Sequence, residues 1–109
     1  MIAIPLQAIP NQAVEVFLDE AWFKIEVKTL NNGAAVVSIA RDDVILVSGQ
    51  RALPLQPLLP YRYLEGEAGN FAFLTDADDY PDYRRFGSGQ QLVYATAAEL
   101  AELRNAPAD

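Results

Sequence analysis

The chain has 109 residues, 51% of them hydrophobic, which fits one globular domain with a single core and argues against disorder. It contains no cysteine and no histidine, which excludes disulfides and thiolate metal sites and removes the side chain most used for proton transfer near neutral pH. The net charge of −7 disfavours binding to nucleic acid, whose phosphates an acidic surface repels.

The first ten residues carry no positive charge and are interrupted by Pro5 and Pro10, so we expect no signal peptide. No apolar run approaches the ~20 residues that a membrane-spanning helix needs. We therefore expect a protein that is made in a cytoplasm and does not insert into a membrane.

Residues 13–47 alternate between apolar and polar side chains, which is typical of strands with one face in water. The clearest row is Phe23, Ile25 and Val27, which alternates with charged residues. Three turn sequences divide the stretch: Asp19-Glu20, Asn31-Asn32-Gly33 and Asp42-Asp43. The pattern predicts a meander of four antiparallel strands. Trp22 follows the first turn directly, and we expect its ring in the core.

The second half of the chain predicts fewer regular elements. Gly49 suits a β-bulge or a sharp bend, and three prolines make residues 52–60 an extended crossover or an edge segment. Strands are predicted over 70–75 and 91–95. Thr96 and Glu99 form a capping box, which predicts a short helix from 97 to about 104.

These elements predict an all-β fold, a small antiparallel barrel or sandwich of six to seven short strands with a short C-terminal helix. Residues 1–95 would form the barrel or sandwich. Residues 96–109 would add the helix and a tail to the same single domain.

The sequence predicts no enzyme, no cofactor and no metal site. A serine nucleophile would need a lysine base, and the two lysines, Lys24 and Lys28, both lie on the predicted wet face of a strand. The acidic residues between 65 and 82 lie largely on one loop, whereas paired catalytic carboxylates face each other across a cleft. Tyr80 and Pro81 break the EF-hand pattern that begins at Asp76, which leaves an irregular calcium site as the alternative.

Aromatic and arginine side chains gather in two predicted loops, 61–69 and 76–89. Tyrosine and arginine are enriched among the residues that dominate protein interfaces. The candidate interface residues are Tyr61, Tyr63, Tyr80, Tyr83, Arg84, Arg85 and Phe86. The alternative is that these rings cover the ends of the fold, with the arginines paired to nearby aspartates.

The order of motifs resembles the baseplate plug protein family of contractile-tailed bacteriophages, of the cyanophage type. The resemblance rests on LVSGQR at 46–51 and on the path from DADDYPD at 76–82 through Phe86-Gly87 to LVY at 92–94, and it spans roughly residues 2–95. The predicted helix over 97–104 is not part of the family pattern.

The resemblance implies a structural virion protein of the tail baseplate that acts by assembly and catalyses no reaction. Its implied partners are the baseplate hub and spike proteins and the tail tube proteins, and it implies a homo-oligomer, either a trimer or a hexamer. A second hypothesis is a small binding module that captures a protein or a carbohydrate through loop 76–89. A third is a carboxylate-dependent hydrolase.

Overall fold

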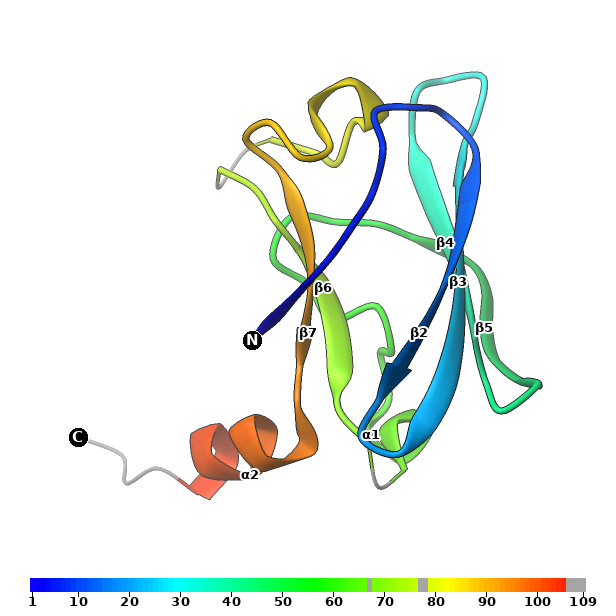
Figure 1. Ribbon diagram of the computed structural model, residues 1–109. Helices are drawn as coiled ribbons and strands as arrows, with labels where there is room; N and C mark the ends of the chain where they lie inside the picture. Colours follow the sequence, from blue (N-terminus) through cyan, green and yellow to red (C-terminus); the bar gives the residue numbers. More distant parts are fainter. Residues whose placement is uncertain (67, 77–78, 106–109) are drawn as a thin grey trace.

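The computed structural model describes residues 1–66, 68–76 and 79–105. Within these residues, seven strands form two antiparallel sheets (Figure 1). The four-stranded sheet has the order β2 (Gln12–Leu18), β3 (Ala21–Thr29), β4 (Ala35–Arg41) and β5 (Val44–Arg51). The three-stranded sheet has the order β1 (Ile2–Ile4), β7 (Gln91–Ala95) and β6 (Asn70–Leu74). The helical segments are α1 (Arg62–Glu65), the 3₁₀ turn η1 (Tyr83–Arg85) and α2 (Ala97–Asn105).

The two sheets pack face to face as a sandwich and do not close into a barrel (Figure 1). Alternation along each strand sends one row of side chains inward, and large apolar residues occupy those positions. Phe23 on β3 meets Phe71 on β6 and Tyr94 on β7, with ring centroids 5.2 and 5.8 Å apart. The predicted all-β fold with a short C-terminal helix is confirmed, in its sandwich form.

The predicted meander is confirmed as β2 to β5, and its hairpins have tight turns. Asp19 and Glu20 both have positive φ, as do Asp42 and Asp43, which is the type I′ geometry that matches the twist of the flanking strands. Gly49 has φ +69° and lies where the register between β4 and β5 shifts, so the predicted bulge is present.

The proline-rich segment 52–60 runs along the outer edge of β6, as one of the predicted alternatives had it. The backbone N–H of Leu55 donates to Phe73 O at 3.0 Å, and that of Leu58 donates to Phe71 O at 2.8 Å. Leu58 and Leu59 are buried, so the segment both covers the edge and fills the core.

Two elements differ from the sequence prediction. Trp22 is 58% exposed, so the expectation of a core position was wrong. Its neighbours Ala21 and Phe23 point inward, and the pleat therefore turns Trp22 to the outer face. The seventh strand is β1, which pairs with β7 from Ile2↔Tyr94 to Ile4↔Leu92.

Candidate protein interfaces

The structure separates the predicted interface residues into two groups at opposite ends of the sandwich. Tyr61 precedes α1 and Tyr63 lies within it, at the lower end in Figure 1, and the loop before β7 lies at the upper end. The rings of Tyr61 and Tyr63 stack with centroids 5.8 Å apart and remain 61% and 77% exposed. They form a flat aromatic surface that no other described residue covers.

The upper-end loop is fixed by a buried amide. The Gln90 side chain accepts a hydrogen bond from the Asp82 backbone N–H at 2.8 Å and donates one to Tyr80 O at 3.1 Å. Tyr80 remains 57% exposed, with the Arg51 guanidinium 5.6 Å from its ring centroid. Tyr83 is half-buried, and its ring lies 5.5 Å from the Arg84 guanidinium.

The two loop arginines are paired to aspartates, as the alternative interpretation of the sequence had it. Arg85 Nη1 lies 2.6 Å from Asp79 Oδ2, and Arg84 Nε lies 3.2 Å from Asp82 Oδ1. The backbone N–H of Arg84 also donates to Asp82, and this hydrogen bond is the main cause that lowers the pKa of the Asp82 carboxyl. The charges of the loop therefore compensate one another in part.

Phe86 is placed differently from the other candidates. Its side chain is only 5% exposed and stacks on Phe73 with centroids 5.4 Å apart. The η1 turn folds this part of the loop back over the core. Phe86 therefore offers little surface to a partner in the isolated chain.

The described acidic residues between 65 and 82 lie in different surroundings. Glu65 is buried and receives both guanidinium nitrogens of Arg104, at 2.7 and 2.9 Å, together with the Asn70 amide at 2.7 Å. Glu67 and Asp78 lie outside the described residues. Among the residues that the structure describes, no three histidine, cysteine or carboxylate side chains gather as a metal site would need.

The outer face of the four-stranded sheet holds apolar residues that the sequence analysis did not place at an interface. Phe17 and Trp22 are 57% and 58% exposed, and their rings lie 5.2 Å apart. Ile45 on β5 is 71% exposed and lies in the same row as Lys24 on this face. The alternation along β3 could have predicted the outward position of Trp22, because it assigns this residue to the same face as Lys24.

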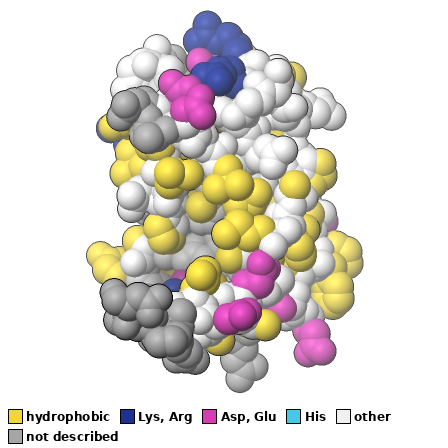
Figure 2. Space-filling model, turned by 90° about the vertical axis from the view of Figure 1, so that its left-hand side faces the viewer, with side chains coloured by type: hydrophobic (Ala, Val, Ile, Leu, Met, Phe, Trp, Pro, Cys, Tyr) yellow, Lys and Arg dark blue, Asp and Glu magenta, His cyan; other side chains and the backbone are white. Residues whose placement is uncertain are grey.

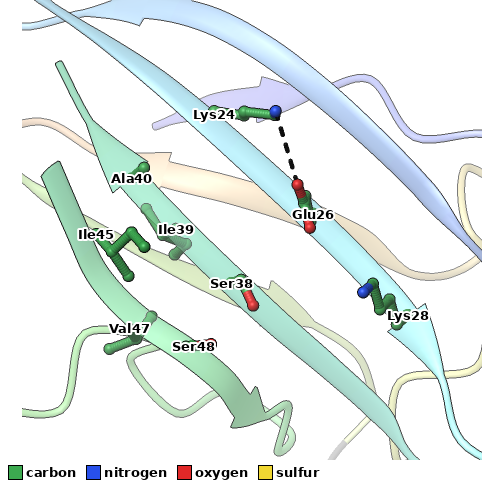
Figure 3. A pocket seen from close by; sticks show the side chains of 9 residues that line it. All are labelled: Lys24, Glu26, Lys28, Ser38, Ile39, Ala40, Ile45, Val47 and Ser48. Atoms are coloured by element: carbon green, nitrogen blue, oxygen red, sulfur yellow. Dashed lines mark ion pairs between the residues drawn. The ribbon is translucent and has the colours of Figure 1, made fainter. Parts of the chain in front are cut away.

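The same outer face brings the lysines near two of the serines without building a nucleophile (Figure 3). Lys24 pairs with Glu26 at 3.7 Å, and Lys24 and Lys28 are both exposed. The Ser38 hydroxyl accepts a hydrogen bond from the Gly49 backbone N–H at 2.9 Å. Ser38 thus has a structural role at the bulge.

A second apolar surface lies on the outer face of the three-stranded sheet (Figure 2). It includes a groove of about 340 Å³ between the sheet and α2, lined mainly by apolar side chains. Met1, Leu55 and Leu103 are the most exposed of them. The sequence analysis missed this surface because it depends on where α2 packs.

Polar contacts tie α2 to the sandwich. Asp19 Oδ2 accepts the Ala97 backbone N–H at 2.9 Å, and the predicted capping box is present, with reciprocal Thr96 and Glu99 hydrogen bonds at 3.1 and 3.2 Å. The Met1 ammonium group lies 2.6 Å from Glu99 Oε2, and this interaction is the main cause that lowers the pKa of Glu99. No helix among the described residues has the length and apolarity to span a membrane.

A β-sandwich with exposed aromatic and apolar side chains on both faces and at both ends is typical of a protein that acts by assembly. Comparison with protein families identifies this class of protein more closely. A family model described as cyanophage baseplate Pam3 plug gp18 matches residues 1–97, so the chain belongs to this family of phage baseplate plug proteins. No curated protein matches this sequence.

The family places the chain in the tail baseplate of a virion, as a structural protein that associates with other baseplate components. The matched region ends at Ala97, the first residue of α2. The rest of the helix that the sequence predicts therefore lies outside the matched region.

Proposed function

We propose that the protein is a non-enzymatic plug at the centre of the baseplate, which contacts the hub and spike proteins and the distal tail tube proteins. It acts through protein–protein assembly as a homo-oligomer, a trimer or a hexamer, and it is built into the baseplate in the host cytoplasm. The observation that carries the proposal is the family match over residues 1–97.

The surface of the chain supports a role in assembly. Trp22 and the stacked pair Tyr61 and Tyr63 expose more than half of their side chains. Such rings supply large contact areas at small entropic cost when a partner covers them. A central position needs contacts on several sides, and these rings lie on different parts of the molecule.

The test is the solution mass of the purified protein, alone and mixed with the hub protein of the same phage. We expect a defined oligomer or a stable complex with the hub by light scattering during gel filtration. A monomer that binds neither hub, spike nor tube protein would contradict the proposal, and loop 76–89 should then be tested with soluble protein and carbohydrate ligands.

Two matched variants locate the hub contact. Trp22→Ser removes an exposed ring from the outer sheet face, and Tyr63→Ser removes one from the α1 end. Both rings are exposed, so circular dichroism should show that both variants stay folded. Loss of hub binding in one variant and not in the other assigns the surface.

A further inference from the structure

The two sheets differ in how their edges are treated. In the three-stranded sheet, residues 54–58 cover β6, and β1 has only three residues before Pro5. In the four-stranded sheet, β2 and β5 each have one neighbour among the described strands. Their outward backbone groups are therefore open to another strand.

Exposed apolar side chains outnumber charged ones on these two edges. Exposed edge strands usually carry charges or prolines that discourage pairing with another chain. Here β2 and β5 carry one charged residue each, and Phe17 on β2 and Val44 and Ile45 on β5 are large apolar side chains that are more than half exposed. The charged outward row, Lys24, Glu26 and Lys28, lies on the central strand β3.

The direction of the strands allows one copy to continue the sheet of the next. A meander of four strands leaves β2 and β5 antiparallel to each other. If β5 of one copy lies beside β2 of an equally oriented second copy, the new ladder is antiparallel, like every ladder inside the sheet.

Charge favours this pairing over like-with-like pairing. Glu15 is the one charged residue of β2, and Arg51 is the one charged residue of β5. A β5–β2 contact brings opposite charges to one interface, whereas β2–β2 or β5–β5 contacts repeat the same charge.

We infer that the β5 edge of one copy pairs with the β2 edge of a second copy, so that the four-stranded sheets join head to tail. The inference rests on the homo-oligomer of the proposed function and names its interface. Such a heterologous contact forms a ring when the rotation closes. The bulges in β5 bend the strand and increase its twist, which suits a curved, closed sheet better than a flat fibre.

The absence of cysteine gives a clean background for a test by cross-linking. Glu15→Cys places a thiol on β2 and Ser48→Cys places one on β5, and both positions are exposed. We expect a short bis-maleimide reagent to link the two variants when they are mixed and to leave each variant alone unlinked. The double variant should give a covalent ladder that ends at the ring size.

A charge variant provides an independent readout. Ile45→Glu should convert the oligomer to monomer, because it places a second negative charge at a contact where β2 already carries Glu15, without touching the core. The matched control is Leu103→Glu, at a position of similar exposure on α2, and it should leave the oligomer intact.

Each outcome decides the inference. Mixed cross-links between β2 and β5 positions, lost with Ile45→Glu, support it. Cross-links within one variant alone, or no mixed cross-links either alone or with the hub protein present, overturn it. If hub binding persists in that case, the plug function stands and only the interface is wrong; if hub binding also fails, the proposed function falls with it.

Discussion

Tyr94 joins the two sheets through a hydroxyl group at the bottom of the sandwich. Its side chain is fully buried, and its hydroxyl accepts the Gly69 backbone N–H and donates to Asp19 Oδ2, both at 2.6 Å. Burial raises the pKa of Tyr94, and the hydrogen bond to the Asp19 carboxylate raises it further. The neutral phenol is therefore the form that the fold requires.

Tyr94→Phe should lower the free energy of unfolding by roughly 1–3 kcal/mol, because the Gly69 N–H and the Asp19 carboxylate each lose a partner. The stability that Tyr94 contributes is present below its unfolded pKa of about 10 and is lost as the pH rises above that value. Urea unfolding of both proteins at pH 8 and pH 11 measures this. We expect the difference between them to shrink at pH 11, and an unchanged difference would contradict the assignment.

At the scale of elements, the two type I′ turns of the meander are built from acidic residues rather than from Asn-Gly. Non-glycine residues at positive φ carry strain, and Asp19 and Asp42 compensate with side-chain hydrogen bonds. Asp42 Oδ1 accepts the Trp22 backbone N–H at 3.0 Å. No side-chain hydrogen bond of this kind involves Asp43 among the described residues.

Asp43→Gly should therefore raise the free energy of unfolding, by up to about 1 kcal/mol, because it relieves strain and creates an Asp-Gly turn. Asp42→Gly is the matched control and should bring no gain, since it removes the hydrogen bond to Trp22. Thermal or urea unfolding measures both variants. Equal effects of the two substitutions would show that the side chain of Asp42 contributes nothing to the turn.

The elements that the sequence predicts best are those with a local cause. The alternation around Phe23 predicts β3, and Thr96 with Glu99 predicts the start of α2. The sequence did not predict β1 as a separate strand, because three residues are too few to show an alternating pattern. Its pairing with β7 also joins segments about 90 positions apart. Such a contact depends on the whole fold rather than on the local sequence.

The exposure of the candidate interface residues could likewise be predicted only where its cause is local. Exposure of Tyr61, Tyr63 and Tyr80 follows from their place in loops, but the burial of Phe86 depends on Phe73 across the core. Exposure of Trp22 depends on the outer face having no further layer among the described residues. Hydrophobicity alone predicts a buried position for such a ring, and only the alternation along β3 shows that Trp22 faces outward.

For the whole molecule, Glu65 is the point where distant segments meet. Its carboxylate binds Arg104 of α2 and Asn70 of β6, and its backbone oxygen accepts Arg41 Nη1 at 2.7 Å. Hydrogen bonding to Glu65 raises the pKa of Arg104. The pair holds α2 against the sandwich.

Arg104→Ala should destabilise the protein clearly more than Arg84→Ala. The first removes two charge-assisted hydrogen bonds from a buried carboxylate, whereas the second removes an exposed pair of the kind typically worth about 0–1 kcal/mol. Urea unfolding compares the two. Adding Glu65→Gln to Arg104→Ala should recover part of the loss, and no recovery would show that packing of α2, rather than charge, causes the effect.

The exposed position of Trp22 determines what the intrinsic fluorescence of this protein reports. It is the one tryptophan of the chain, and its indole lies in water on the outer sheet face beside Phe17. The indole is exposed to water in the folded and in the unfolded state, so unfolding should hardly shift the emission maximum. Covering the face should move the emission to shorter wavelength, which makes the natural chromophore a gauge of assembly rather than of folding.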